Sequence, residues 1–465
     1  MDGQLKIEGN GRLIVVSNRL PKGDVPSGGL IFALHEALTE IGGLWVGAAD
    51  PTTTASDGLT DIGGDKKYDL ATFELTHKEH KQYYLGYSNS VLWPLFHHRP
   101  DLLEIHAVDF EAYTAVNRRV ARSIAAVIEP EDTIWVHDYH FLMLGKELRD
   151  LGVENRIGVF LHIPFPNASD VMALPESQVI ARWLAAFDLV GLQTMRDVIA
   201  ARDVLLMDPK VHILNDGSWV REDRHFRVRS YPIGIDARAF AKTARNAKPL
   251  ELQLAPDAPL LLGVDRLDYS KGLVHRFHAF DSYLSARDAA EPRPTFLQIA
   301  PCSREDVIAY QEIREELEQA AGSINGAHAD LDWTPLRYVR RHIDRDVIAG
   351  LYRRADVALV TPLADGMNLV AKEYVAAQDP EDPGVLILSH FAGAAEQMQQ
   401  ALLVNPFDAD GFAEAIREAV NMPLDERKER HAALLEVVMR EDINWWTSSY
   451  LASLRRTPTP VRMKA

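Results

Sequence analysis

The sequence contains very little cysteine. Cys302 is the only one among 465 residues, which excludes an internal disulfide. An excess of positive charge is also lacking: 50 Lys and Arg against 67 Asp and Glu give a formal net charge of -17, which argues against a nucleic acid or an anionic membrane as partner. No apolar run is long enough to span a bilayer. The first residues, MDGQLKIEGNGR, are polar and lack the apolar core of a signal peptide. We therefore expect a cytoplasmic protein.

The length and composition fit a globular protein of two domains. Hydrophobic residues make up 47% of the chain and charged residues 25%, as in ordinary globular proteins. A chain of this length is too long for one core, so two domains of roughly 200 residues each are expected. The motif YPIGID, which ends at Asp236, is followed by a polar, alanine-rich segment up to Lys248. We predict domains over residues 1–236 and 237–440, followed by a C-terminal segment over 441–465.

Short apolar runs alternate with helix-like segments along the chain. A strand–helix alternation of this kind predicts parallel sheets covered by helices on both faces, so the expected fold class is α/β. The runs that read as buried strands are Arg12–Ser17, Thr133–His137, Ile157–His162, Leu189–Gln193, Leu260–Val264, Thr295–Ile299, Val357–Thr361 and Val385–Ser389.

The stretch from Val360 to Gln378, VTPLADGMNLVAKEYVAAQ, is the most informative in the chain. Its apolar start reads as a central parallel strand, Asp365 and Gly366 make a tight turn, and good helix formers follow. The first turn of a helix offers unpaired N–H groups and the positive end of a dipole, which suit a phosphate. Carboxylates on both sides, Asp365 and Glu373, indicate binding of sugar or ribose hydroxyls. The same residues also fit an ordinary strand–turn–helix with a capping aspartate.

The segment Pro259–Leu273, PLLLGVDRLDYSKGL, repeats this strand–loop–helix order. Arg266 and Lys271 follow its strand, at the position where an open α/β sheet binds ligands. Two cations there can neutralise a diphosphate without a metal, although a solvated loop with two surface cations also fits. Asp265 and Asp268 make a poor metal–diphosphate site, because two residues separate them and one of these is Arg266.

Ten sequence blocks, taken together and in order, resemble the trehalose-6-phosphate synthase family over nearly the whole chain. The blocks are VVSNRLP (15–21), SGGL (27–30), YSNSVLWPLFHHR (87–99), IWVHDYH (134–140), FLHIPFP (160–166), YPIGID (231–236), GVDRLDYSKGL (263–273), QIAPCSRED (298–306), DGMNLVAKEYVAAQ (365–378) and GVLILSHFAGAAEQM (384–398). The resemblance implies a GT-B fold, in which two Rossmann-like domains have parallel sheets facing across a cleft. It implies that the N-terminal domain binds the acceptor, that the C-terminal domain binds the nucleotide sugar, and that the last helix crosses back to the first domain.

The resemblance also implies a donor site, residue by residue. The implied contacts are Arg266, Lys271 and the backbone of Leu369 and Val370 for the diphosphate, Gly29 approaching the phosphates from the other domain, Glu373 for the ribose, Ile343 for the base through its backbone, and Asp365, Gly366, Met367, Asn368 and His162 for the sugar. The catalytic residues implied are Arg266, Lys271, Asp365 and His162.

The acceptor contacts that the resemblance implies are Arg19, Trp45, Tyr84, Trp93, Asp138 and Arg304. Two arginines with phenol and indole donors suit a phosphate dianion. The family commonly reads WFGWSG where this chain reads WVGAAD (45–50), so that Ala48 replaces the second tryptophan. This departure leaves the identity of the acceptor sugar open.

The reaction implied by the resemblance transfers glucose from a nucleotide-glucose, with UDP-glucose expected, to glucose 6-phosphate, and it retains the anomeric configuration. No carboxylate is evident in the sequence as a nucleophile. The resemblance implies a front-face reaction, in which the departing diphosphate deprotonates the incoming hydroxyl. The protein then positions the substrates and stabilises charge. No metal or other cofactor is expected, because the histidine pairs His97–His98 and His137 with His140 lie in family blocks without a metal role.

Three alternatives stay open. Ala48 favours a glucosylglycerol-phosphate synthase, which uses a smaller phosphorylated acceptor, and a pseudo-glycosyltransferase that joins a cyclitol is related to it. A binding-only sensor of sugar phosphate is a third, although the retained Arg266, Lys271, Asp365 and Glu373 argue against it. The expected partners are the two substrates, without nucleic acid or membrane. The sequence leaves open the donor base and the oligomeric state, a homo-oligomer included.

Overall fold

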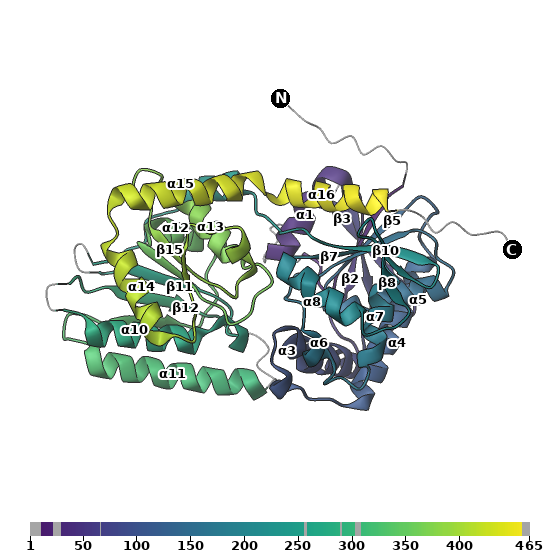
Figure 1. The fold of residues 1–465 in the computed structure, drawn as a ribbon, viewed down its shortest axis with the longest axis horizontal. Helices are drawn as coiled ribbons and strands as arrows, with labels where there is room; N and C mark the ends of the chain where they lie inside the picture. The colour runs from purple at the N-terminus through teal and green to yellow at the C-terminus, as the bar shows by residue number, and fades with distance from the viewer. Residues whose placement is uncertain are drawn as a thin grey trace, which may run out of the picture. The chain divides into compact units, whose positions relative to one another are not determined.

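The structure is a computed structural model that describes residues 11–21, 29–65, 67–254, 258–288, 291–302 and 308–457. It divides into two compact units (Figure 1). Unit 1 comprises Met1–Tyr231 and Trp446–Ala465, and unit 2 comprises Pro232–Trp445. The divisions therefore fall five residues before the boundary predicted after residue 236 and five residues after the one predicted after residue 440. No helix in the described ranges combines the length and apolar character needed to cross a membrane.

Unit 1 is built on a sheet of ten strands. The order across the sheet is β3-β4-β2-β1-β5-β6-β7-β10-β9-β8, parallel from β4 to β10 and antiparallel at both ends. The strands are β1 (Leu13–Val16), β2 (Gly43–Ala48), β3 (Thr60–Asp65), β4 (Tyr68–Phe73), β5 (Thr133–His137), β6 (Arg156–Phe160), β7 (Leu189–Leu192), β8 (Val211–Ile213), β9 (Trp219–Arg221) and β10 (Arg224–Ser230). β1 (LIVV) and β5 (TIWVH) are buried along their whole length, as expected for central parallel strands with apolar centres.

Helices cover this sheet and connect its parallel strands. They are α1 (Gly29–Ile41), α2 (His77–Glu79), the π-helix η1 (His80–Leu92), α3 (Trp93–Phe96), η2 (Pro100–Leu102), α4 (Ala107–Ala125), η3 (Tyr139–Phe141), α5 (Leu144–Asp150), α6 (Ala168–Val171), α7 (Ser177–Leu184), α8 (Met195–Leu205) and, from the end of the chain, α16 (Ile443–Arg456). α16 packs directly on the central strands through Tyr450, whose hydroxyl donates to the carbonyl of Val159 over 3.0 Å. Glycine is required beneath it, because a Cβ at Gly158 would lie 2.3 Å from the Tyr450 hydroxyl.

Unit 2 has the Rossmann strand order. Its six strands lie in the order β13-β12-β11-β14-β15-β16 and are all parallel, which is the doubly wound order 3-2-1-4-5-6. The strands are β11 (Leu260–Val264), β12 (Thr295–Ile299), β13 (Leu336–Val339), β14 (Val357–Val360), β15 (Val385–Ser389) and β16 (Leu402–Val404). In such a sheet, ligands bind where the strand order reverses, and here this point lies between β11 and β14.

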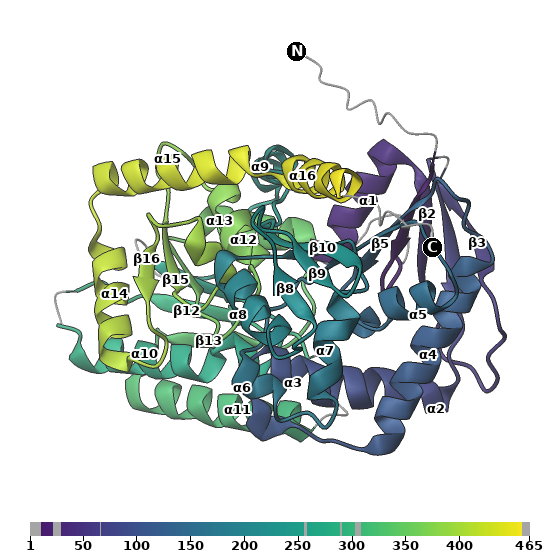
Figure 2. The same ribbon diagram turned by 45° about the vertical axis from the view of Figure 1, so that its right-hand side comes forward.

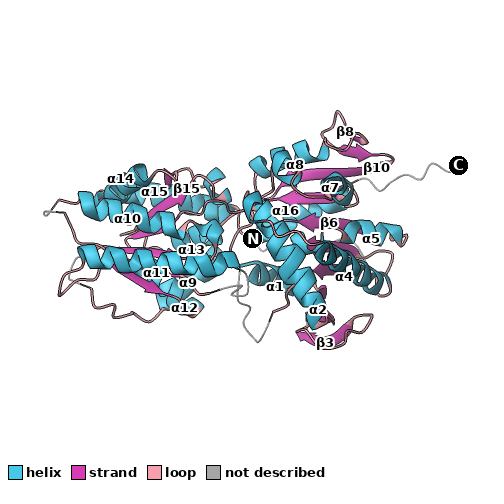
Figure 3. Ribbon diagram, turned by 90° about the horizontal axis from the view of Figure 1, so that it is seen from below, coloured by secondary structure: helices cyan, strands magenta, loops and turns pink. Residues whose placement is uncertain are grey.

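Helices cover both faces of this second sheet. They are α9 (Ala237–Asn246), η4 (Tyr269–Lys271), α10 (Leu273–Ala286), α11 (Ile308–His328), α12 (Arg345–Arg354), α13 (Leu369–Ala377), η5 (Gly393–Glu396), α14 (Ala409–Asn421) and α15 (Leu424–Arg440). Figures 1 and 2 show α10 and α11 on one face and α12 and α13 on the other. In Figure 3, the magenta strands of each unit lie among cyan helices, which is the layered α/β arrangement that the alternation predicted.

All eight strands predicted from the sequence are present, with ends that differ by at most two residues. The two-domain α/β fold class is confirmed. The prediction did not include the antiparallel extension β8-β9-β10, in which β10 reads RHFRVRS and has no continuous apolar run. β10 buries only part of its residues, so its sequence does not stand out as a strand.

Candidate active site

The two loops that the sequence singled out in unit 2 are bonded to each other at the point where the strand order reverses. One follows β11 and the other follows β14. The backbone N–H of Leu363 donates to the carbonyl of Ser270 over 2.7 Å. Gly272 has φ +66, and a Cβ there would lie 2.3 Å from the carbonyl oxygen of Thr361. Only glycine therefore lets the two loops approach this closely.

An ion pair joins the functional side chains of these loops. The ammonium of Lys271 lies 2.5 Å from a carboxylate oxygen of Asp365, and the two side chains are only 12% and 13% exposed. The same carboxylate oxygen accepts a hydrogen bond from the Asn368 side-chain amide over 3.0 Å. The structure thus brings together three residues predicted for the donor site. A partly buried charge pair of this kind is strong compared with an exposed one, because water screens it less.

The turn that leads into α13 is held in an uncommon conformation. Asn368, the residue before the helix, has φ 75, and its side chain makes no cap to the helix. The carbonyl of Met367 accepts a hydrogen bond from the backbone N–H of Ala394 over 2.8 Å, and the carbonyl of Asp365 accepts one from Gly393 over 3.0 Å. Neighbouring backbone therefore fixes the turn, and the side chains of Leu369 and Val370 at the start of the helix are half-buried. Its first N–H groups point outward along the helix axis, where an anion is stabilised.

Glu373 lies one turn further along α13 with its side chain 18% exposed, and one carboxylate oxygen is 3.6 Å from the guanidinium of Arg345. Burial raises the pKa of Glu373 to about 7, and Arg345 opposes this shift. Arg345 begins α12, two residues after the half-buried Ile343. The sequence reading did not include Arg345, and no signal in the sequence links it to a residue on another helix.

Arg266 lies in the loop after β11 and is exposed. The two aspartates beside it are buried and bonded to protein groups. Asp265 pairs with the guanidinium of the fully buried Arg276 over 2.7 Å, and Asp268 accepts hydrogen bonds from the Tyr310 hydroxyl over 2.8 Å and the Ser270 backbone over 3.0 Å. Both carboxylates hold the loop in place. In the described ranges, no group of three or more His, Cys, Asp or Glu side chains is placed to hold a metal ion.

In unit 1, Asp138 and His162 lie together at the ends of neighbouring strands. Asp138 follows β5 with φ 71, and its backbone N–H donates to the carbonyl of Phe160 over 2.8 Å. One of its carboxylate oxygens accepts a hydrogen bond from the backbone N–H of His162 over 3.0 Å. The strained aspartate therefore fixes the main chain of His162. Strain of this kind persists only where the surroundings hold it, and it is common at functional sites.

Two of the residues predicted to contact the acceptor are also in contact with each other. The guanidinium of the exposed Arg19, in the loop after β1, donates to the Tyr84 hydroxyl over 2.8 Å. Tyr84 lies in the π-helix η1, and its ring is nearly parallel to that of His140, 5.7 Å away. Trp93 follows η1 and is 5% exposed. π-Helical turns are rare and frequently occur at functional sites, and this one was not predicted from the sequence.

Three further residues of the predicted site are Trp45, Gly29 and Arg304. Trp45 belongs to the core: its side chain is 0% exposed, and its indole N–H donates to the Ser17 hydroxyl over 2.8 Å. No surface of the Trp45 side chain is exposed, and its role at the acceptor site, which the resemblance implies, stays a prediction. Gly29 is the first residue of α1. Arg304 lies outside the described residues.

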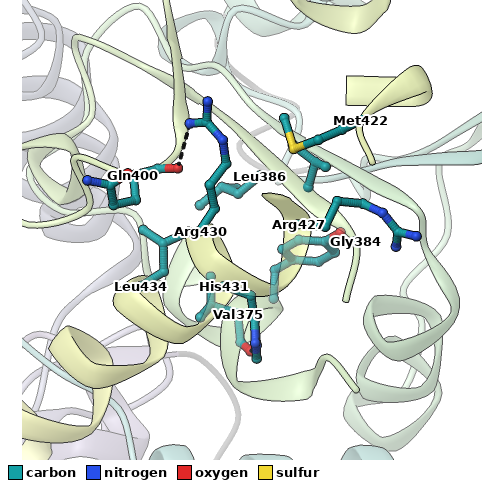
Figure 4. A pocket seen from close by; sticks show the side chains of 11 residues that line it. Val375, Gly384, Leu386, Gln400, Met422, Arg427, Arg430, His431 and Leu434 are labelled. Atoms are coloured by element: carbon teal, nitrogen blue, oxygen red, sulfur yellow. Dashed lines mark hydrogen bonds between the residues drawn. The ribbon is translucent and has the colours of Figure 1, made fainter. Parts of the chain in front are cut away.

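A small cavity beside α13 is separate from these residues (Figure 4). It measures about 10 Å³ and is lined by Tyr374, Val375, Gly384, Val385, Leu386, Gln400, Met422, Arg427, Arg430, His431 and Leu434. The Nε2 of His431 is 3.0 Å from the carbonyl oxygen of Val375. A space of this size holds at most one water molecule, so it cannot accommodate a nucleotide sugar.

Several known proteins are similar to this chain over nearly its whole length. A trehalose-6-phosphate synthase of Cronobacter sakazakii (strain ATCC BAA-894) is 45% identical over 453 residues, which cover 96% of this chain and 95% of that protein. An α,α-trehalose-phosphate synthase (UDP-forming) from Burkholderia xenovorans, solved in complex with glucose-6-phosphate, has a TM-score of 0.90 and 43% identity and covers 96% of this chain and 100% of its own. An E. coli structure bound with UDP-2-fluoro glucose has a TM-score of 0.91 and 43% identity, covering 96% and 99%.

These likenesses define a glycosyltransferase of the GT-B fold, built from two Rossmann-like domains. The model of glycosyltransferase family 20 matches residues 15–456, and the chain belongs to that family.

Proposed function

We propose that the protein transfers glucose from UDP-glucose to glucose 6-phosphate with retention, giving α,α-trehalose 6-phosphate and UDP. The main observation behind this proposal is the ion pair between Lys271 and Asp365. It lies where the strand order of the Rossmann sheet reverses, which is where such sheets bind ligands. The relatives support the choice of substrates, because one was solved with glucose-6-phosphate and another with UDP-2-fluoro glucose. We propose the cytoplasm as its location.

The donor binds to unit 2 in this proposal. Arg266, Lys271 and the first N–H groups of α13 hold the diphosphate and stabilise the charge that develops on it as it leaves. Asp365, with the Gly366–Asn368 turn, binds hydroxyls of the glucose, and Glu373 binds the ribose. Ile343 contacts the base through its backbone. Gly29 and His162 of unit 1 complete the donor contacts. These protein cations take the place of a divalent metal, so we propose a metal-free reaction.

In this proposal, all of the predicted acceptor contacts except Arg304 belong to unit 1. Arg19, Tyr84 and Trp93, together with Arg304, hold the phosphate, and Asp138 lies beside the acceptor sugar. The contact between Arg19 and Tyr84 supports this grouping, since it places a cation and a phenol donor side by side. Both groups can donate hydrogen bonds to one phosphate dianion.

One observation favours a smaller acceptor, such as glycerol 3-phosphate. The backbone N–H of Ala48 donates to the carbonyl of Asn18 over 3.4 Å, so Ala48 lies close to Arg19. Where the family commonly has an aromatic ring, this chain offers only a methyl group beside the proposed phosphate site. The proposed acceptor site therefore lacks this aromatic wall or has a different one in its place.

The test is an activity matrix of acceptors against donors. Glucose 6-phosphate, glycerol 3-phosphate and fructose 6-phosphate are each combined with UDP-, GDP- and ADP-glucose, and nucleotide release and product are measured. The proposal expects the highest kcat/KM for glucose 6-phosphate with UDP-glucose. Activity with glycerol 3-phosphate and none with glucose 6-phosphate would replace it with the alternative, and binding without turnover would indicate a sensor.

A further inference from the structure

Two histidine rings at the ends of β5 and β6 are bonded to each other. The Nδ1 atom of His137 lies 3.1 Å from the Nε2 atom of His162, and the rings are stacked with centroids 5.3 Å apart. The two residues are 25 positions apart in the sequence and lie on neighbouring parallel strands. His162 belongs to the proposed donor site, whereas His137 has no role in the function proposed above.

His137 is enclosed by aromatic rings. Its side chain is 0% exposed, and its ring lies 4.5 Å from that of Trp135 and 6.3 Å from that of Trp446, measured between centroids. Its other ring nitrogen, Nε2, is buried and has no hydrogen-bond partner in the part of the chain that the structure describes. The bond to His162 is thus the single polar contact of this ring among those residues. A buried polar group is normally kept only where its hydrogen bond matters.

Neither ring carries a charge near neutral pH. Burial lowers the pKa of His162 to about 3, and burial followed by the proximity of His162 lowers the pKa of His137 well below its ordinary value. A neutral imidazole has one nitrogen that donates and one that accepts. The bond between the rings therefore contains one hydrogen, contributed by one partner or by the other.

This single hydrogen couples the two tautomers. If Nδ1 of His137 carries it, then Nε2 of His162 accepts, and the hydrogen of His162 must be on Nδ1. If Nε2 of His162 carries it, then Nδ1 of His137 accepts, and the hydrogen of His137 must be on Nε2. Both rings therefore always hold their hydrogen on the same type of nitrogen. The nitrogen of His162 that remains for a ligand, Nδ1, is a donor in the first state and an acceptor in the second.

We propose that His137 is a positioning residue that holds the His162 ring and sets the hydrogen-bonding state of the Nδ1 atom that His162 offers to the donor sugar. This inference rests on the proposed function, which places His162 beside the sugar. The hydrogen bond from the His162 backbone to Asp138 fixes the main chain, and His137 fixes the ring. A sugar hydroxyl can both donate and accept, so it can pair with either state of Nδ1. His162 binds and orients the sugar, His137 holds His162 in place, and neither ring exchanges a proton with the sugar during the reaction.

The test compares two substitutions of His137 that differ in hydrogen bonding. His137→Leu removes the ring nitrogens, whereas His137→Asn keeps an amide group near the position of Nδ1. Trp446→Leu is the control, because it opens the same aromatic enclosure and leaves the bond between the histidines intact. For each variant, kcat and KM for UDP-glucose are measured together with the affinity for UDP, which lacks the sugar.

The expected result is a fall in kcat/KM for UDP-glucose of roughly tenfold or more in His137→Leu, as for the loss of a buried hydrogen bond at a reacting sugar. UDP affinity should stay within about threefold of wild type, and His137→Asn should restore most of the activity. Unchanged kcat/KM in a folded His137→Leu variant, or an equal loss of UDP affinity, would overturn the proposal.

A second measurement does not depend on the activity of any variant or on the substrate being correct. In wild-type protein labelled with ¹⁵N-histidine, the ring shifts of His137 and His162, assigned with His137→Asn and His162→Asn, report the tautomers. The proposal expects two neutral rings with the same tautomer, and two different tautomers or a charged ring would refute it. If the wild type fails to use UDP-glucose and glucose 6-phosphate, the proposed function fails, and the NMR result still decides whether the rings are coupled.

Discussion

The ammonium of Lys271 lies 2.5 Å from the carboxylate of Asp365, although 94 residues separate them in the sequence. This contact joins a residue proposed to hold the diphosphate to a residue proposed to hold the glucose. Without a ligand, the carboxylate neutralises the cation. In the proposed donor complex, the diphosphate competes with Asp365 for Lys271, and the sugar hydroxyls become new partners of Asp365. On this proposal, the pair links binding of the leaving group to binding of the transferred sugar.

Replacing the Asp365 carboxylate should raise the affinity for the product UDP and lower kcat/KM for the substrate UDP-glucose. In Asp365→Asn, Lys271 loses its competing partner, so the affinity for UDP should rise by a few-fold. The sugar loses a charged acceptor, and a hydrogen bond to a charged group contributes about 1.5–3 kcal/mol, so kcat/KM for UDP-glucose should fall roughly ten- to hundredfold. Calorimetric UDP affinity and steady-state kinetics give the two numbers. A parallel loss of both would show that Asp365 serves only to hold the loop.

Arg266→Ala should reduce turnover far more than binding. It removes one of two cations that face the diphosphate, and loss of such a preorganised group typically costs about 3–4 kcal/mol in the transition state, on the order of a hundred- to a thousandfold in kcat. Arg293→Ala, which changes a half-exposed arginine of the same unit, serves as the control. Turnover within about threefold of wild type, a difference below about 0.7 kcal/mol, would remove Arg266 from the reacting centre.

Activity should persist when divalent metals are removed. In the proposed reaction, Arg266, Lys271 and the start of α13 supply the positive charge that a divalent metal would otherwise provide. The measurement is the initial rate after dialysis against excess EDTA, with and without added Mg²⁺ or Mn²⁺. Complete loss of activity that either ion restores would contradict the metal-free reaction.

The eight strands predicted from the sequence could be found because they are almost completely buried, whereas the partly exposed parallel strands β2, β4, β13 and β16 were not predicted. β11, LLLGV, and β15, VLILS, are continuous apolar runs, and both were found with the predicted ends. Because the carboxyl ends of parallel strands lie at the same edge of a sheet, the sequence alone places the loops that follow these strands at that edge. β10 could not be found in this way, since its alternating charged residues are those of a partly exposed strand.

Contacts between residues that are distant in the sequence could not be predicted. A sequence shows which residues are charged but not which of them meet, so the pairs Glu373 with Arg345 and His137 with His162 emerged only from the fold. Trp45 lies in a block that resembles the family's acceptor-binding segment, and the fold shows that its side chain is buried in β2. Burial depends on what packs against a strand, and one strand's sequence does not contain this information.

Arg19→Ala should weaken use of the phosphorylated acceptor and leave the donor unaffected. A charge-assisted hydrogen bond to phosphate contributes about 1.5–3 kcal/mol, so kcat/KM for glucose 6-phosphate should fall roughly ten- to hundredfold. Tyr84→Phe removes the neutral partner of Arg19 and should cost less, about tenfold at most. In Arg19→Ala, the ratio of kcat/KM for glucose 6-phosphate to kcat/KM for glucose should decrease. If the variant keeps the full preference, the phosphate lies elsewhere.

The last prediction concerns Lys372, a charged residue of α13 that is 0% exposed. Its ammonium donates to the carbonyl of Ile233 over 2.8 Å. Burial lowers its pKa from 10.5 to about 7, although Glu441 opposes the shift. The unfolded chain therefore binds more protons than the folded one between about pH 7 and 10.5, so the free energy of unfolding rises with pH in that window.

The test compares wild type with Lys372→Met, whose side chain has similar length and no charge. Relative to this variant, wild type should gain stability by up to roughly 1.4 kcal/mol per pH unit as the pH rises above 7. Urea unfolding at pH 7, 8 and 9 measures the difference, and other titrating groups cancel in the comparison. Lys428→Met, which changes an exposed lysine of α15, should follow wild type at every pH. Parallel pH curves for wild type and Lys372→Met would show that the buried amine keeps its ordinary pKa, because a group that titrates alike in both states leaves the pH dependence of folding unchanged.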